Sequence, residues 1–445
     1  MEKAGYLSNF SYIFIPFSIK QEKDFIKFNN DLSANCMWMP VNDEIRYLHK
    51  YVSDRLVNEY KSNKNLFHYR LSESVSDFTD IYLNNRCYQT APKKFNDITT
   101  TFDFTISDVQ LFSFNTSICI MAFQLQFENN DPLYIAAAQY YLRKIDVEHI
   151  RVKTDNGDFV SHSFIELSKS ILGNLTDIYS LDFFFYASTK NERANFFTYI
   201  DLPKKENYNE ELFHLKWCYN DHFTYDSNCL EKDSVNYVAN SNTIWGISPS
   251  AAVCIINRCD KNRQFIENTF QHNVQNHYLF TYILLLHQKY MLYLFLTKIS
   301  IDIDDDLNLL ENYKRRLYEF NTKYLFSRIS EVPQYQRFYE KVMESFSIKE
   351  MFADVQEPLS RLAEIQRQVN EEQRQKRDHN INTALTALSL LTIFSAITDA
   401  LGITANLGWL IPPLWSKIIQ LTIGSIVIIL SVAILFRLFS LKNKR

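Results

Sequence analysis

Hydrophobic residues follow one pattern in the first 380 or so residues of this chain and another in its last 65. Near the C-terminus, residues 381–398 and 418–436 contain no charged side chain. Each stretch is close to the ~20 apolar residues with which an α-helix crosses ~30 Å of hydrocarbon. The preceding part mixes apolar and polar positions and is long enough for one large or two ordinary domains. The pattern predicts a water-soluble part mounted on a two-helix transmembrane hairpin.

The first part contains both strand-like and helix-like segments. Alternating or strongly β-forming runs predict strands at residues 10–19, 109–114, 117–127, 178–186, 195–202 and 243–256. Helical periodicity predicts helices at residues 43–61, 132–145 and 162–172. Asp131 and Pro132 make a plausible start for the second of these helices. This mixture predicts an α/β or α+β domain over residues 1–262.

Residues 263–347 are predicted to be a helical part of the same soluble region. The segment 263–299 is apolar enough to resemble a third span, but His287, Gln288 and Lys289 interrupt its centre. Because charge is costly in lipid, we expect a buried helix here instead. A break at residues 302–306 follows, where Asp304 would cap a second helix running to about Ser330.

The segment that leads into the first apolar stretch is predicted to be a stalk helix. A heptad-like stripe runs through Val355, Leu359, Leu362, Gln366, Val369 and Gln373. No Gly or Pro occurs between Pro358 and Gly402, which favours one helix over residues 360–401, ~60 Å long, over a surface helix that stops near Asp378. We therefore expect a stalk (348–380), a first span (381–401), an external loop (402–417), a second span (418–437) and a basic tail (438–445).

Basic residues flank the two predicted spans on one side. They are Arg374, Lys376 and Arg377 before the first span and Arg437, Lys442, Lys444 and Arg445 after the second. The positive-inside rule then places both termini in the cytoplasm, and the N-terminus has no apolar signal region. We expect a multi-pass protein of the inner (cytoplasmic) membrane.

Composition excludes several classes of function. The net charge of −4 argues against direct nucleic-acid binding, which needs a basic surface. The seven glycines form neither a P-loop nor a G-x-G-x-x-G fingerprint. The histidines are dispersed, without an H-E-x-x-H or a G-x-S-x-G motif, and the seven scattered cysteines are expected to be reduced thiols. We do not expect an enzyme.

The predicted first span carries a short motif. TIF at residues 392–394, then Ile397 and Thr398, then Gly402 and Ile403 are similar in order and spacing to the first transmembrane helix of the CorA-like magnesium transporter superfamily. The predicted cytosolic domain, stalk, short outer loop and basic tail also resemble it. The superfamily's Gly-Met-Asn signature is replaced here by Ala405, Asn406 and Leu407. The resemblance therefore does not extend to magnesium selectivity.

The missing signature and a soluble domain rich in Phe, Tyr and Asn look more like the divergent CorA-like effectors associated with type III CRISPR antiviral defence. That branch is thought to respond to a nucleotide second messenger, a conjugate of S-adenosylmethionine with AMP (SAM-AMP). The resemblance implies SAM-AMP as a candidate ligand and a divalent cation such as Mg²⁺ as a candidate permeant ion.

The resemblance also implies a homopentamer whose pore is lined by the first span. Carried over by position, the pore-lining residues are Ile381, Ala384, Ala387, Leu391, Ser395, Thr398, Asp399, Gly402, Ala405 and Asn406. Most are spaced three or four residues apart, on one helical face, and most are small, which leaves a lumen or merely permits close packing. Ser395 and Thr398 could replace water around an ion, and Ile381 and Leu391 could form hydrophobic constrictions. A ring of Asp399 could attract cations, or Asp399 could simply be solvated at the interface.

Ligand-binding candidates in the soluble part come from three segments. They are Trp217 and Asp221, then Trp245 and Ser248, then the basic residues Arg143, Lys144, Arg151 and Lys153. These residue types could stack a base, accept from an amino group and neutralise a phosphate, although each is also common in cores and on solvated surfaces.

The sequence thus predicts an oligomeric membrane channel that a cytosolic ligand gates through the stalk. Two alternatives stay open: a constitutive divalent-cation transporter, and a membrane-anchored binding protein without a pore.

Overall fold

The computed structural model describes residues 8–41, 47–56, 64–72, 87–153, 158–186, 193–227, 234–257, 263–302 and 307–406, and single residues or short runs from 414 to 429. The chain divides into two compact units, Met1–Ser360 and Arg361–Arg445. The helices of residues 263–347 therefore belong to the same unit as the sheet.

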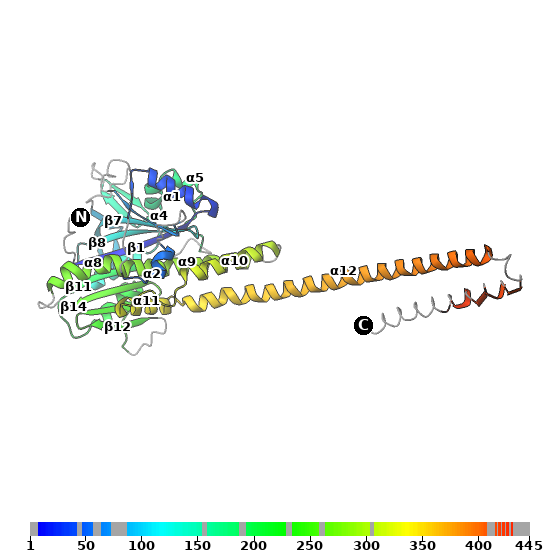
Figure 1. Cartoon of the computed structure of the whole chain (residues 1–445). Helices are drawn as coiled ribbons and strands as arrows, with labels where there is room; N and C mark the ends of the chain where they lie inside the picture. The colour runs from blue at the N-terminus through cyan, green and yellow to red at the C-terminus, as the bar shows by residue number, and fades with distance from the viewer. Residues whose placement is uncertain are drawn as a thin grey trace. The chain divides into compact units, whose positions relative to one another are not determined.

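A mixed sheet of twelve strands forms the centre of the first unit (Figure 1). Its strands are β1 (Asn9–Ser18), β2 (Trp38–Pro40), β3 (Leu66–Leu71), β4 (Cys87–Thr90), β7 (Asp103–Phe114), β8 (Ile118–Phe127), β9 (Ile150–Lys153), β10 (Phe159–His162), β11 (Phe196–Leu202), β12 (Val235–Asn240), β13 (Thr243–Ile247) and β14 (Ala251–Asn257). The main order is β10-β9-β4-β7-β8-β1-β11-β14-β13-β12, and β3 pairs with both β2 and β7. β11 and β14 are parallel, whereas the other paired strands are antiparallel. A separate hairpin joins β5 (Lys93–Phe95) to β6 (Ile98–Thr100).

Helices precede, connect and follow the strands. They are the 3-10 helix η1 (Glu22–Asp24), α1 (Phe25–Ala34), α2 (Lys50–Leu56), α3 (Pro132–Leu142), α4 (Phe164–Leu172), α5 (Leu175–Ile178), α6 (Asn209–Trp217), α10 (Leu307–Tyr324), α11 (Pro333–Ser345) and α12 (Ile348–Asn406). Between β14 and α10, one continuous helix comprises α7 (Arg263–Phe265), α8 (Gln271–Asn273) and α9 (Leu279–Asp302), with π-helical turns at Ile266–Phe270 and Val274–Tyr278.

Both faces of the sheet are covered, which explains why β1 is buried at every position. On one face Ile13, Ile15 and Phe17 belong to a core that includes residues of α1, α3, α4 and α6. On the other face Phe14 lies against Tyr282 of α9, with ring centroids 5.5 Å apart. Because successive side chains of a strand point to opposite faces, a central strand between two helical layers is apolar throughout.

The predicted mixed α/β region is confirmed, and several predicted elements lie close to their expected places. Asp131 caps α3 by accepting a hydrogen bond from the backbone N–H of Leu133. α4 begins after Ser163, which forms a capping box with Glu166, so the residues just before it are free to form β10. Of the predicted helix 43–61, residues 47–56 are described, and α2 covers Lys50–Leu56, whereas 42–46 and 57–63 lie outside the described residues.

The predicted strand at residues 178–186 is wrong. α5 ends at Ile178, Ser180 adopts a left-handed backbone, and only an isolated bridge joins Asp182 to Ser18. Phe183 is nevertheless buried, 5.2 Å from the ring of Phe17. Residues 178–186 are therefore apolar because an irregular segment packs into the core. Periodicity alone does not distinguish such a segment from a strand.

Two further predicted boundaries differ. Residues 243–256 form a hairpin of β13 and β14 instead of one strand, because Ser248 turns the chain by accepting from the N–H groups of Ser250 and Ala251. The helix after α9 ends at Tyr324, before the expected Ser330, and α11 begins at Pro333. The predicted cap Asp304 lies outside the described residues.

Candidate functional site

The root of α12 is part of the first unit. Val355 and Leu359 are 0% and 2% exposed, whereas Val369, on the same predicted stripe, is 42% exposed. The helix begins at Ile348, where the stalk was predicted to start, and it passes through Pro358, although an unbroken helix was predicted only from residue 360. A proline inside a helix removes one backbone hydrogen bond, and burial of Val355 and Leu359 on either side offsets that loss.

Two helices among the described residues are long and apolar enough to cross a membrane, by length and composition: Arg263–Lys298 and Ile348–Asp399. In the first, 83% of the most apolar window is buried, as expected for a helix of the soluble part, and in the second 0% is buried. A shorter apolar helix, Lys417–Ile426, covers the start of the predicted second span, whose end lies outside the described residues, as does the basic tail.

The predicted pore-lining residues all lie on α12. The side chains of Ile381, Ala384, Ala387, Leu391, Ser395, Thr398, Asp399 and Gly402 are exposed, and those of Ala405 and Asn406 lie outside the described residues. The hydroxyl of Thr398 donates to the carbonyl oxygens of Phe394 and Ser395 at 3.2 and 2.7 Å. Thr383, Thr386, Ser389 and Thr392 likewise donate to the carbonyl four residues earlier. These hydroxyl protons need no water, which suits an apolar surrounding.

The structure brings together two of the predicted ligand residues at the C-terminal ends of α3 and α6. Arg143, the residue that ends α3, is 2% exposed and donates to the carbonyl oxygen of Trp217 at 3.1 Å. Its guanidinium carbon lies 4.9 Å from the ring centroid of Tyr140, and its Nε atom is buried without a hydrogen-bond partner. Burial lowers the pKa of Arg143, and the charge of Arg193 lowers it further.

Aromatic rings continue from Trp217 across this end of the unit. Trp217 is stacked near Tyr219 at 6.0 Å, and Tyr219 stacks on Phe223 at 4.1 Å with an interplanar angle of 13°. Phe223 is 40% exposed and lies 6.1 Å from Tyr140. The rings therefore form a partly exposed row beside the buried cation of Arg143.

Lysines flank the same row of rings. The ammonium of Lys144 lies 5.8 Å from the centroid of Tyr140, and that of Lys93 lies 5.2 Å from the centroid of Tyr141. Burial and then the charge of Lys144 lower the pKa of Lys93. Burial, Lys93 and Lys144 lower the pKa of His149 to about 4. We call the half-buried region formed by Lys93, Tyr140, Tyr141, Lys144, His149 and Phe223 the cation–ring surface.

A carboxylate holds one side of the cation–ring surface in place. Asp221 accepts a hydrogen bond at 2.7 Å from the backbone N–H of Asn96, at the tip of the β5–β6 hairpin that carries Lys93. Asn96 and Asp97 both have positive φ, as a two-residue hairpin turn requires. The predicted ligand residue Asp221 thus positions Lys93, and its Oδ1 atom is buried without a hydrogen-bond partner among the described residues.

The other predicted ligand residues lie elsewhere. Trp245 is fully buried on the opposite face of the sheet, 4.6 Å from the ring of Phe338. Ser248 is buried in its turn and donates to the carbonyl oxygen of Lys216. Arg151 and Lys153 lie on β9, where Arg151 covers the ring of Phe159 at 4.3 Å.

Sequence reasoning missed Lys93, Tyr140, Tyr141, His149 and Phe223. Lys93 and Phe223 are far apart in the chain, and they come to the same end of α3 because the hairpin places Lys93 beside Tyr141 and the chain after α6 places Phe223 beside Tyr140. The pair Tyr140 and Tyr141, next to Arg143 and Lys144, was the one local signal that could have indicated rings beside cations.

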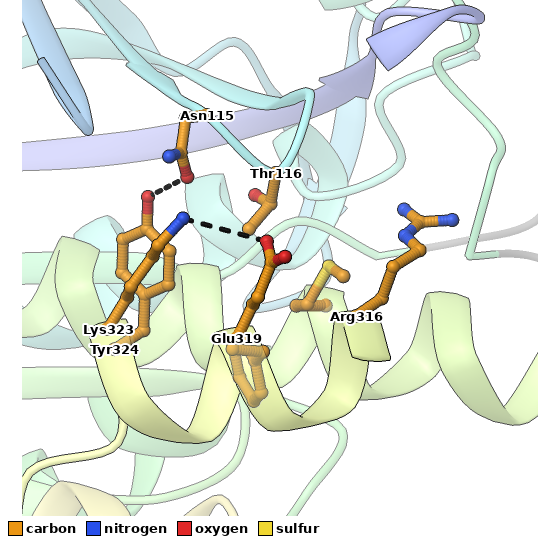
Figure 2. A pocket seen from close by; sticks show the side chains of 8 residues that line it. Asn115, Thr116, Arg316, Glu319, Lys323 and Tyr324 are labelled. Atoms are coloured by element: carbon orange, nitrogen blue, oxygen red, sulfur yellow. Dashed lines mark hydrogen bonds and ion pairs between the residues drawn. The ribbon is translucent and has the colours of Figure 1, made fainter. Parts of the chain in front are cut away.

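A polar pocket of about 60 Å³ lies elsewhere, between the β7–β8 turn and α10 (Figure 2). Lys323 pairs with Glu319 at 3.6 Å, and Tyr324 donates to the side chain of Asn115. Beside it, Thr116 contacts Nε2 of the buried His287 at 2.8 Å. The pocket has room for about two waters or one small ion.

No protein-family model matches this chain, and neither a curated protein nor a solved structure matches it. Within the described ranges, no group of three or more His, Cys, Asp or Glu side chains is placed to hold a metal ion.

Proposed function

We propose that this chain is the subunit of a CorA-like oligomeric membrane channel, a homopentamer in which a ligand bound to the cytosolic unit gates a pore lined by α12. In this proposal α12 and the apolar helix after it span the inner membrane, and both termini are cytoplasmic. Small residues on one face of α12 would line the lumen, with Leu391 as a hydrophobic constriction.

One observation carries the proposal. α12 is a single helix whose root is buried in the first unit and whose apolar part has none of its window buried. An apolar helix that finds no cover in its own chain needs lipid or other chains around it. In this proposal α12 carries a displacement from its root to its apolar end, because the same helix belongs to both regions.

The cation–ring surface supports the ligand-gated form of the proposal. It offers half-buried cations and exposed ring faces on the same unit that holds the root of α12. A nucleotide messenger of the SAM-AMP type, which the sequence resemblance implies, has the anionic and planar groups that such a surface accepts. A divalent cation is the proposed permeant ion.

Ion flux from liposomes tests the pore directly. Full-length protein is reconstituted with an entrapped fluorescent cation indicator, and its oligomeric state is measured by cross-linking. Leu391→Asn is expected to raise the basal flux several-fold, because an amide wets a hydrophobic constriction. Ile393→Asn is the matched control, since Ile393 lies on the opposite face of α12.

The outcomes separate the alternatives. No flux in a confirmed oligomer, with or without candidate ligands, contradicts the pore and leaves a membrane-anchored binding protein. Strong basal Mg²⁺ flux that no ligand changes favours a constitutive transporter. Equal effects of Leu391→Asn and Ile393→Asn contradict the assignment of the pore face.

A further inference from the structure

Several cations lie on or beside the cation–ring surface. Among the described residues no ion pair joins Lys93, Arg143, Lys144 or Arg193 to a carboxylate. Lys93 and Lys144 are only partly exposed. A folded protein ordinarily pairs or fully hydrates such charges, because burying unpaired charge is costly. The carboxylate of Asp221 is bound to the Asn96 N–H and forms no ion pair with these cations among the described residues, so an anion can complete the site.

The rings next to these cations indicate which chemical group of the ligand lies beside its anion. Tyr140 contacts Arg143 and Lys144 on one side and Phe223 on the other. Tyr219 covers one face of Phe223, and 40% of the Phe223 side chain stays exposed. An exposed aromatic ring beside a cation is suited to a planar group next to a negative charge.

The site is also rigid. Asp221 fixes the β5–β6 hairpin through the Asn96 N–H, and Tyr141 donates to the carbonyl of Lys94 at 3.4 Å. Arg143 is fixed by Trp217 and by the backbone of α3. Lys93 and Lys144 lie against the neighbouring rings of Tyr141 and Tyr140, whose centroids are 5.1 Å apart, so both ammonium groups are placed before any ligand arrives, which lowers the entropic cost of binding.

We propose that the cation–ring surface binds a small phosphate ester, with the phosphate between Lys93 and Lys144 and a planar ring on Phe223. This rests on the proposed function in that it names the ligand class and the place of the gating site. The buried guanidinium of Arg143 adds positive potential beneath the phosphate without needing to touch it.

Binding to the full-length protein in detergent tests this by calorimetry, independently of flux. The probes are AMP, adenosine and inorganic pyrophosphate. AMP is expected to bind once per chain, pyrophosphate more weakly, and adenosine weakest. Lys93→Met with Lys144→Met should weaken AMP and pyrophosphate by at least about tenfold, since charge-assisted hydrogen bonds are lost. Lys204→Met, at an exposed lysine, is the control and should change neither.

Phe223→Ala separates the ring from the phosphate. It should weaken AMP by roughly tenfold, the scale of one stacking contact, and leave pyrophosphate unchanged. Thermal unfolding checks that each variant is folded. Absence of binding by AMP and pyrophosphate at millimolar concentration, or equal weakening by Lys204→Met, would overturn the site. Binding without any flux would instead uphold the site and contradict the channel.

Discussion

α9 and the C-terminal half of α12 are similarly apolar, yet they lie in opposite surroundings. The window that includes α9 is 83% buried between the sheet and α11, whereas the window in α12 is 0% buried. Hydropathy indicates only that a helix avoids contact with water. What decides its place is whether the same chain provides a surface to cover it, and among the described residues such a surface covers α9 and not the apolar part of α12.

The polar residues of the two helices show the same difference. In α9, His287 contacts Thr116, Gln288 donates to the carbonyl of Tyr324 at 2.7 Å, and Lys289 donates to Pro249 at 3.2 Å. These partners lie outside α9, so its polar groups bind it to the surrounding unit. In α12 the hydroxyls of Thr and Ser bond to carbonyls of their own helix. α9 is thus suited to a protein interior and α12 to lipid or to a ring of identical helices.

A lysine placed in each helix should give the largest difference between α9 and α12. Leu285→Lys puts a charge at a fully buried position of α9 and should cost more than about 4 kcal/mol, enough to unfold the first unit. Leu388→Lys, at a 59% exposed position of α12, should leave that unit folded and reduce membrane insertion, by about 3 kcal/mol at a helix centre. Circular dichroism and membrane fractionation measure the two effects. Similar behaviour of the two variants would contradict the distinction.

Alanine substitutions along α12 should locate the residue at which the helix stops packing into the first unit. Leu359→Ala removes a side chain that is 2% exposed and should destabilise the first unit by about 2–5 kcal/mol. Val369→Ala, at a 42% exposed position, should change stability by less than about 1 kcal/mol in the absence of a partner chain. Thermal unfolding in detergent compares them. A large effect of Val369→Ala would show that neighbouring stalks pack there.

Much of this fold could be predicted from the sequence, where local pattern and burial agree. The strand near residue 10, the cap at Asp131 and the burial of the helix containing His287 all came from such agreement. Prediction failed at residues 178–186, where an apolar run covers the core without joining the sheet. Short strands such as β9 and the edge strand β12 were missed, since few residues carry their pattern.

The candidate ligand site was predictable only in part. Arg143 and Trp217 were identified by residue type and do meet, but the pairing of Lys93 with Tyr141 depends on a hairpin folding over α3. Trp245 was chosen for the same reason as Trp217 and is a core residue. Residue type indicates possible chemistry, and only tertiary contacts decide which aromatic residues remain accessible.

Lys289 of α9 lies between the cation–ring surface and the root of α12, the two ends of the proposed gating route. Its ammonium donates to the side chain of Asn195 and to Pro249, and it lies 4.7 Å from the ring of Phe346, just before α12. The neighbouring Ala194 donates its backbone N–H to the carbonyl of Arg143 at 2.8 Å. Contacts therefore run from the cation–ring surface past the end of β11 to the root of α12.

Replacing Lys289 tests whether α9 transmits the effect of a bound ligand to α12. Lys289→Met should cost about 1–3 kcal/mol by removing hydrogen bonds to buried acceptors. It should also reduce the change in flux that a bound ligand produces, while binding at the cation–ring surface persists. Lys298→Met, on the same helix, is the control. A full ligand response in Lys289→Met, measured in liposomes, would exclude this route.

The smallest expected effect is a pH dependence of stability that α9 contributes through its buried histidine. Burial lowers the pKa of His287 to about 3, below its ordinary 6.5. The unfolded chain therefore binds a proton between these values that the folded chain does not, and stability must fall as pH drops below about 6.5. One such group contributes at most about 1.4 kcal/mol per pH unit. The lowered pKa of His149 acts in the same direction, and partial exposure of its side chain makes this contribution smaller.

His287→Gln should make the thermal midpoint differ less between pH 7 and pH 5. His222→Gln, at an exposed position, is the control and should leave that difference unchanged. If His287→Gln keeps the full pH dependence, acid sensitivity arises outside α9, and the polar centre of that helix is not what sets it apart from α12.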